Sequence, residues 1–193
     1  MNTNNKREAH YAIDPIYINR WSPRAFSDKP IEEDKLNSVF EAARWAPSAA
    51  NWQPWRFIIA RTSKDREKFL SFINDNNVEW CKRAPVLVTI ISRKVRNEEG
   101  DPNAFHSFDT GTAWGYLTLE AARQGLITHG MGGFSKEGAR NELGIPDEYN
   151  IEAVFAMGYY DKNAPLSVRN KEREIPSERR SVKEIIYDGY FQE

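Results

Sequence analysis

The chain has 193 residues, which suits a single domain, and its 27 basic and 28 acidic side chains give a net charge of −1. That balance argues against a protein built to bind nucleic-acid backbones or anionic lipid surfaces. The longest strongly apolar run, residues 85–91, is too short to cross a bilayer, and no signal peptide is visible. A single cysteine, Cys81, fits a reducing compartment and a buried structural role, so a cytoplasmic protein is expected.

In the first half of the chain, the spacing of apolar residues predicts helices and strands in turn. Pro30 and the acidic residues 32–34 suit the first turn of a helix, which Pro47 ends. Ser63 fits the N-cap of a second helix. A run rich in β-branched residues then predicts a strand that is buried on both faces. The predicted elements are a helix at 31–44, a strand at 55–61, a helix at 63–74 and a strand at 85–92.

The second half predicts a long helix that is apolar or small on nearly all sides, which indicates burial in the core or in an oligomer interface. Ser135 caps a further helix, and Gly144 ends it. The tail beyond residue 181 is too apolar to be free and is expected to dock on something. The predicted elements are a helix at 105–124, a strand running into a glycine turn at 126–134, a helix at 135–144, a strand at 151–160 and a polar arm at 161–181. The sum is an α+β fold with four or five short strands in one layer.

The sequence offers no obvious side-chain catalyst. It contains neither of the common glycine-rich phosphate loops nor a nucleophile elbow. His10, His106 and His129 are far apart in the chain and support a metal site only weakly, so no metal is predicted. Aromatic residues make up 12% of the chain, which suits flat ligands and interfaces. A bound cofactor is therefore expected to carry the chemistry.

One segment, "NRWSPRAF", has the composition of an anion clamp. Arg20, Ser22 and Arg24 alternate, so they share one face if the segment is extended. Two guanidinium groups and a hydroxyl on one face would bind a phosphate or carboxylate. Taken alone, the same segment fits a surface stretch with scattered charge.

Two other segments suit the edge of a flat ring. In "APSAANWQPW", Ser48, Asn51 and Gln53 supply short polar groups between stiffening prolines. In "GMGG", glycines let backbone N–H groups approach a ring closely, although alone this motif fits an ordinary turn.

Together, and in this order, these segments resemble the nitroreductase family of FMN-dependent oxidoreductases. "APSAANWQPWRF" followed by a strand is the most specific element. The resemblance covers nearly the whole chain, through "NRWSPRAF", "AARWAPSAANWQPWRFIIA", "APVLVTI", "DTGTAWGYLTLEAARQGL", "GMGGF", "LGIP", "AVFAMGYY" and "RRSVKEII". It implies one domain over residues 1–193 with a C-terminal arm from about 161. It also implies a central mixed, mostly antiparallel sheet flanked by helices, and an intertwined homodimer.

The resemblance further implies two FMN sites at the dimer interface, each lined by both subunits. Reduced NAD(P)H would pass hydride to the flavin N5, and the flavin would then reduce a planar nitroaromatic or quinone acceptor by ping-pong kinetics. The positions that match the family's FMN contacts are Arg20, Trp21, Ser22, Arg24, Pro47, Ser48, Ala49, Asn51, Gln53, Met131, Gly132, Gly133, Arg179 and Arg180.

Within this set, Arg20 matches the phosphate-binding arginine, and Arg180, with Arg179, matches the C-terminal basic group that returns to the phosphate. Arg24 matches a basic residue near the flavin N1–O2 edge. Asn76 and Glu79 lie about where the family has a mid-chain lysine or asparagine, although Glu79 has the wrong charge. Trp52 is large for its position and is expected to shape substrate entry, whereas Trp21 and Pro23 replace a second arginine and a small residue.

Three alternatives stay open at this point. Within the fold, the protein could be a reductive dehalogenase or a flavin-dependent oxidase. It could also bind flavin without turnover, or it could be a dimer that holds no cofactor and uses its aromatic residues only at the interface. A flavin absorbance band tests for the cofactor, and bleaching by NADPH without oxygen separates an enzyme from a binding protein.

Overall fold

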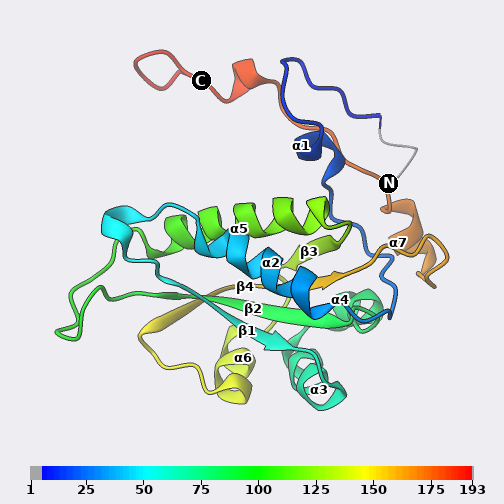
Figure 1. Ribbon diagram of the computed structural model, residues 1–193, viewed down its shortest axis with the longest axis horizontal. Helices are drawn as coiled ribbons and strands as arrows, with labels where there is room; N and C mark the ends of the chain where they lie inside the picture. The colour runs from blue at the N-terminus through cyan, green and yellow to red at the C-terminus, as the bar shows by residue number, and fades with distance from the viewer. Residues whose placement is uncertain (1–5, 193) are drawn as a thin grey trace.

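The computed structural model describes residues 6–192, so residues 1–5 and 193 of the predicted domain lie outside it. The chain folds around a four-stranded sheet with the strand order β1-β2-β4-β3 (Figure 1). A sheet flanked by helices confirms the predicted α+β class. The sheet was expected to be mixed and mostly antiparallel, and all three of its pairings are antiparallel. The strands are β1 (Trp55–Ala60), β2 (Val86–Arg93), β3 (Ile127–Met131) and β4 (Tyr149–Gly158).

Helices cover both faces of this sheet, and Figure 1 shows α2 and α5 on one side with α3 and α6 on the other. One apolar cluster joins α2 and α5 to the sheet through residues such as Val39 and Leu117. The second joins α3, α4 and α6 to the opposite face through Phe69, Trp80 and Ala139. The central strand β2 is therefore buried on both faces, as predicted. The helices are α2 (Glu33–Arg44), α3 (Ser63–Phe72), α4 (Asp75–Cys81), α5 (His106–Arg123) and α6 (Lys136–Leu143).

The helix ends show where local sequence signals hold. Ser135 accepts a hydrogen bond from the backbone N–H of Gly138, and Gly144 adopts the left-handed conformation (φ 62°), so both predicted ends of α6 are confirmed. The predicted cap at Ser63 is wrong by one residue, because the side chain of Thr62 accepts from Asp65. The helix predicted at 63–74 ends early because Ile73 becomes extended and bridges to Phe134.

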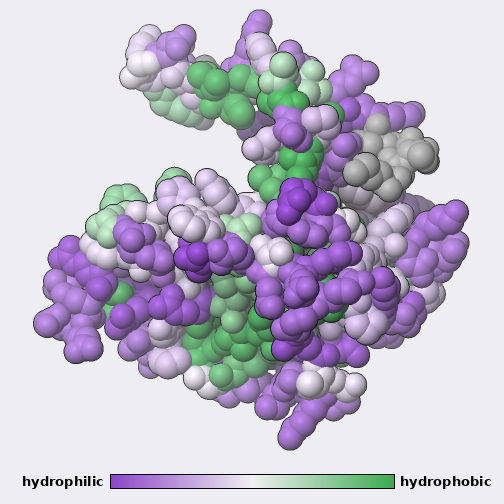
Figure 2. Space-filling model, viewed as in Figure 1, coloured by the Kyte–Doolittle hydropathy of each residue, from purple (hydrophilic) through white to green (hydrophobic). Residues whose placement is uncertain are grey.

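The first and last described segments of the chain project together from this body (Figure 1). The short helix α1 (Ile16–Asn19) and the segment after α7 (Val168–Glu172) lead to a tail that contains the 3-10 turn η2 (Val182–Glu184). Neither the tail nor one face of α5 is covered by the rest of the chain, and Figure 2 shows apolar residues on the projecting tail. The exposed apolar side chains include Tyr11, Ile13 and Tyr17 near one end, Phe105, Phe108 and Tyr116 on or beside α5, and Ile185, Ile186, Tyr187, Tyr190 and Phe191 in the tail.

This exposure qualifies two expectations. The long helix α5 was expected to be buried in the core or in an oligomer interface, and the side chain of Phe108 is 76% exposed in the single chain, so the core of this chain does not bury every face of the helix. The tail was expected to dock on something, and Ile185 is 62% exposed, so the tail does not dock on its own chain. None of the helices in the described part of the chain is long and apolar enough to span a membrane.

Candidate functional site

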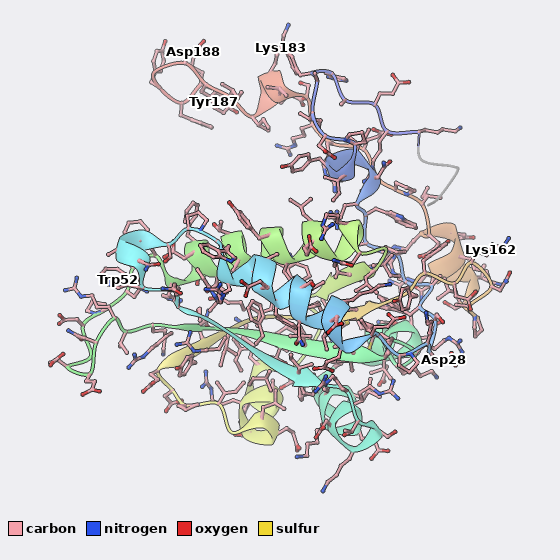
Figure 3. All side chains as sticks on the ribbon, in the orientation of Figure 1. Asp28, Trp52, Lys162, Lys183, Tyr187 and Asp188 are labelled. Carbon is pink, nitrogen blue, oxygen red and sulfur yellow. The ribbon has the colours of Figure 1, made fainter. Side chains whose placement is uncertain are left out.

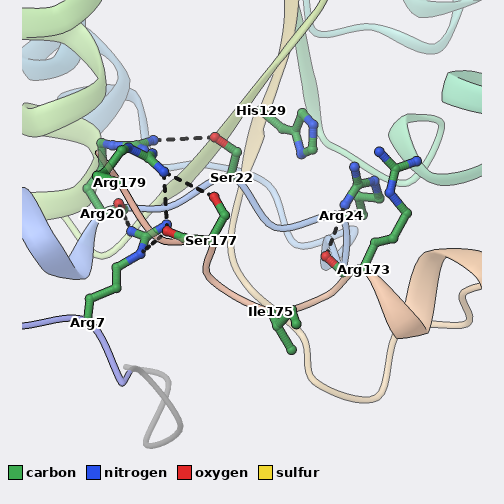
Figure 4. A pocket seen from close by; sticks show the side chains of 9 residues that line it. All are labelled: Arg7, Arg20, Ser22, Arg24, His129, Arg173, Ile175, Ser177 and Arg179. Atoms are coloured by element: carbon green, nitrogen blue, oxygen red, sulfur yellow. Dashed lines mark hydrogen bonds between the residues drawn. The ribbon is translucent and has the colours of Figure 1, made fainter. Parts of the chain in front are cut away.

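A strongly cationic pocket of about 310 Å³ lies where the chain after α1 meets β3 and the segment after α7 (Figure 4). Five of its nine lining residues are arginines, and none is acidic. The lining residues are Arg7, Arg20, Ser22, Arg24, His129, Arg173, Ile175, Ser177 and Arg179. Such a pocket attracts an anion, because guanidinium groups that face one another lose repulsion when a negative group enters.

Hydrogen bonds to backbone carbonyls hold the arginine side chains of one half of the pocket. Arg7 donates to the carbonyl oxygens of Arg20 (3.0 Å) and Ser177 (2.8 Å), and so ties the start of the chain to its C-terminal arm. Arg20 Nη1 lies 3.4 Å from Ser22 Oγ, which places both groups on the same side, as the alternating pattern predicted. Burial lowers the pKa of Arg20, and the charges of Arg179 and Arg7 lower it further. The group stays protonated, but it is surrounded by like charge.

The segment that carries Arg24 is fixed by two other parts of the chain. Its neighbour Ala25 accepts a hydrogen bond from the N–H of Asp161 just after β4 (2.9 Å). The carboxylate of Glu174 accepts from the backbone N–H groups of Arg24 and Ala25, each at 2.9 Å. The carboxylate of Glu174 thus accepts from backbone N–H groups and not from the guanidinium group of Arg24, and Arg24 lines the pocket.

His129 on β3 lines the same pocket and was not predicted as a binding residue. Its Nδ1 donates to the carbonyl oxygen of Pro23 (3.0 Å), and its ring packs on Trp80 with the ring centroids 4.5 Å apart. Burial lowers the pKa of His129 to about 4, and the nearby Arg24 and Arg173 charges act in the same direction. His129 is therefore neutral at physiological pH. A polar residue immediately before the "GMGG" segment was the only signal available in the sequence.

A second cavity of about 160 Å³ adjoins the first and shares Arg24 and Arg173 with it. It is lined by Arg24, Asn76, Asn77, Glu79, Trp80, Arg169, Asn170 and Arg173. The two mid-chain residues that the sequence singled out, Asn76 and Glu79, thus lie beside Arg24. The carboxylate of Glu79 accepts from the Ser167 N–H and the Asn170 side chain, each at 2.9 Å. These hydrogen bonds lower the pKa of Glu79 and leave it ionised.

The "APSAANWQPW" loop forms a separate, strained structure at the start of α5. The Ala49 N–H donates to the buried carboxylate of Asp109 in the first turn of that helix (3.1 Å). Three residues that are not glycine have positive φ angles, namely Ala50 (45°), Asn51 (58°) and Gln53 (47°). Each such residue costs roughly 1–3 kcal/mol, so the surrounding contacts must hold the loop in this shape. Strain of this kind is typical of binding sites.

The predicted site residues therefore fall into separate groups. Arg20, Ser22, Arg24 and Arg179 meet in the arginine pocket, whereas the neighbouring Arg180 is exposed and does not line it. Trp21 packs near Tyr160 and is not among the lining residues. The loop residues Pro47, Ser48, Ala49, Asn51 and Gln53 lie at the other end of α5. Figure 3 shows Trp52 of this loop and Asp28 beyond Arg24 at opposite ends of the molecule.

The helix α5 separates the "APSAANWQPW" loop from the arginine pocket. The 18 residues of α5 span about 27 Å at 1.5 Å per residue, and this helix lies between the loop and the strand β3 that carries His129. At the end of β3, Met131 is buried in the core, and the Gly133 carbonyl accepts from the Asn74 N–H (3.1 Å). A Cβ at Gly133 would lie 2.8 Å from the side-chain nitrogen of Asn77, so a larger residue there would displace that side chain. Gly132 and Gly133 do not line the pocket.

Comparison with known proteins gives a consistent result. The sequence profile of the nitroreductase family matches residues 17–78 and 67–159. The chain is 29% identical over 154 residues to a Streptomyces coelicolor protein named as an NADH dehydrogenase/NAD(P)H nitroreductase, covering 70% of this chain and 76% of that one. It is 28% identical over 174 residues to an NADH dehydrogenase of Thermus thermophilus, covering 74% and 83%.

Solved structures show the same fold. A crystal structure described as an oxidoreductase containing FMN is 40% identical and has a TM-score of 0.92, covering 100% of this chain and 99% of that one. A nitroreductase family protein from Streptococcus pneumoniae is 23% identical with a TM-score of 0.73, covering 90% and 98%, and supports the fold alone. Because the family profile spans most of the chain and the fold agrees with it, this chain belongs to the nitroreductase family.

Proposed function

We propose that this protein is an FMN-dependent oxidoreductase that transfers electrons from NAD(P)H to a small planar acceptor of the nitroaromatic or quinone type. Membership of the nitroreductase family and the 40% identity to an FMN-containing oxidoreductase support the enzyme class and the cofactor. The observation that carries the proposal is the arginine pocket. It unites the predicted clamp residues Arg20, Ser22 and Arg24 with Arg179 from the far end of the chain.

The chemistry of the pocket fits the phosphate of FMN. A phosphate monoester presents three acceptor oxygens, and guanidinium and hydroxyl groups are the donors that bind it best. Arg7, Arg20 and Arg179 gather on one side with Ser22 and Ser177 (Figure 4). The lining includes no carboxylate that would repel the phosphate. When bound, FMN supplies the hydride and electron transfer chemistry, and the side chains of this chain bind it, orient it and set its charge environment.

We also propose that each site is built by two copies of the chain. The clamp and the strained loop lie at opposite ends of α5, so the loop of one chain cannot line the pocket of the same chain. A two-fold dimer gives both chains the same interface and can bring the loop of one to the clamp of the other. The exposed apolar residues of α5 and of the tail support such an interface, because a soluble monomer rarely exposes so many together.

The pocket also bears on the mechanism. Its arginines do not exchange protons near neutral pH, and His129 is held neutral by burial, so the lining side chains act by charge and position. NAD(P)H and a planar acceptor that use the same face of the flavin cannot bind together. Ping-pong kinetics are therefore expected.

Cys81 is buried, and burial raises the pKa of its thiol to about 12, so this thiol is unreactive. A single cysteine without a disulfide fits a reducing compartment such as the cytoplasm.

The purified protein tests this proposal directly. Cofactor released by heat and compared with standards should be FMN, and NADH or NADPH added without oxygen should bleach its absorbance. Steady-state rates with a nitroaromatic and with a quinone should give parallel double-reciprocal lines. FAD as the main cofactor would contradict the cofactor assignment, and a flavin that does not bleach would indicate a binding protein. Intersecting lines would contradict the shared face.

A further inference from the structure

The arginine pocket contains more positive charge than one phosphate requires, and this charge is divided into two groups. In Figure 4, Arg7, Arg20 and Arg179 gather on one side with Ser177, while Arg24 and Arg173 lie together on the other. His129 and Ile175 line the space between them. The first group is sufficient for a phosphate, so the second group needs a separate explanation.

The second group faces both cavities at once. Arg24 Nη1 donates to the carbonyl oxygen of Arg173 (3.4 Å), and both residues line both cavities. Burial lowers the pKa of Arg24, and the charges of Arg173 and Arg169 lower it further, against the opposing effect of Glu174. Within residues 6–192, none of these three arginines forms an ion pair with a carboxylate. Their charge is therefore available to a ligand.

The short helix α7, which carries Arg169 and leads into Arg173, is held at both ends by acids that do not neutralise it. At its start, the Glu79 carboxylate accepts from the Ser167 N–H and from the side chain of Asn170, which is 5% exposed. Beyond its end, Glu174 accepts from the backbone N–H groups of Arg24 and Ala25. Both carboxylates thus fix the position of α7 through N–H groups and form no ion pair with its guanidinium groups. This accounts for Glu79, whose charge was unexpected from the family pattern.

We propose that Arg173, together with Arg24, forms a second charge group of the FMN site that stabilises the reduced flavin, and that Glu79 is a positioning residue for it. The proposal rests on the proposed function. Transfer of a hydride from NAD(P)H, which leaves NAD(P)⁺, turns a neutral flavin ring into an anion, whereas the charge of the phosphate is unchanged. A cation near the ring therefore binds the reduced form more tightly than the oxidised form, while a cation at the phosphate binds both equally.

The test compares Arg173→Gln with Arg173→Lys, which keeps the charge, and with Lys171→Gln. Lys171 is a matched control, because it is a cation only two residues before Arg173, at the end of α7, is exposed and lines neither cavity. Fluorescence titration of each apoprotein gives the affinity for oxidised FMN, and spectroelectrochemical titration of each FMN-loaded protein gives the midpoint potential. Both readouts are independent of turnover.

For Arg173→Gln we expect the affinity for oxidised FMN to change by less than about threefold and that for reduced FMN to fall about tenfold, the scale of one charge-assisted contact. A tenfold difference lowers a two-electron potential by about 30 mV. Arg173→Lys should keep most of the potential and Lys171→Gln all of it. Glu79→Ala and Glu79→Gln remove the same negative charge, but only Gln keeps an acceptor oxygen for Ser167 and Asn170, so the potential of Glu79→Gln should lie above that of Glu79→Ala.

Failure of the role proposed for Arg173 can be told apart from failure of the proposed FMN site. Arg20→Ala should weaken both redox forms of FMN equally and leave the potential unchanged. If that holds while Arg173→Gln also leaves the potential unchanged, the role of Arg173 is contradicted and the FMN site stands. An equal fall in Arg173→Gln and Lys171→Gln would also contradict it, because it would reflect net charge alone. A wild-type protein that binds no FMN would overturn the proposed function itself.

Discussion

Arg20 is the residue in which the sequence pattern and the pocket agree most closely. It is partly buried, lies beside Ser22 Oγ and is surrounded by Arg7 and Arg179. Arg20→Ala should weaken FMN binding by roughly 1.5–3 kcal/mol, the scale of a charge-assisted hydrogen bond. Fluorescence titration of the apoprotein measures this. Arg61→Ala is a suitable control because Arg61 pairs with Glu33 at the surface. Unchanged affinity in Arg20→Ala would place the phosphate elsewhere.

His129 gives a prediction about pH. Its pKa is about 4 in the folded protein against an ordinary value of 6.5, so between these values the unfolded chain binds a proton that the folded chain does not. The free energy of unfolding should therefore be complete above about pH 6.5 and fall as the pH is lowered toward 4. The loss is on the order of 3 kcal/mol when complete.

Urea unfolding of the apoprotein at several pH values tests this. His129→Asn, which removes the titrating ring, should flatten the dependence between pH 6.5 and about 5. Carboxylates such as Glu41, with an ordinary pKa of 4.5 that Arg44 lowers to about 2, contribute mainly below that window. A variant with the same slope as the wild-type protein would remove His129 as the cause.

At the scale of an element, the strained loop depends on its attachment to α5. The Asp109 carboxylate is 4% exposed and accepts the Ala49 N–H. Asp109→Ala leaves that N–H without its partner, so the free energy of unfolding should fall by about 1–3 kcal/mol. Equilibrium urea unfolding measures the change. Asp109→Asn keeps an acceptor oxygen of the same shape and should lose less; an equal loss in both would indicate that the charge at the helix start, not the hydrogen bond, matters.

Elements with strong local signals were predictable from the sequence, and elements fixed by distant contacts were not. The caps of α6 and the apolar run of β2 specify their own structure, so Ser135, Gly144 and the buried strand were predicted correctly. The break between α3 and α4 arises because Ile73 bridges to Phe134, far along the chain. No local sequence pattern predicts a contact between residues so far apart in the chain.

The same distinction applies to the site. The clamp residues share a short motif, and their meeting in one pocket follows from it. Arg7 and Arg173 also line the pocket but lie in polar segments without a motif, so only the fold identifies them. For the C-terminal basic group the resemblance favoured Arg180, with Arg179 as its companion, and in the single chain it is Arg179 that lines the pocket. A linear sequence also cannot say that two of its motifs lie at opposite ends of one helix.

For the whole molecule, this separation predicts that two defective chains can repair one another. Arg20→Ala damages the clamp. Ala49→Trp obstructs the loop but keeps the backbone N–H that Asp109 accepts. Each variant alone should bind little FMN. A mixed dimer, purified through two different tags, should contain one intact and one doubly defective site and regain FMN binding.

Light scattering on the same sample should give twice the chain mass of 22.3 kDa. A mixed dimer that binds no more FMN than its parents would show that clamp and loop do not serve one site. A wild-type protein that holds FMN as a monomer would show that one chain is sufficient.

The five arginines of the pocket also make the stability of the fold depend on ionic strength. Without an anion among them, guanidinium groups this close repel one another, and dissolved salt screens that repulsion, with a Debye length of about 10 Å at 0.1 M. With FMN bound, the same salt weakens an attraction instead. Added sodium chloride should therefore raise the melting temperature of the apoprotein and lower that of the FMN-loaded protein. Two melting curves that shift in the same direction would contradict this. In a cell, the cofactor would then act as a counter-ion that completes the fold before it carries any electron.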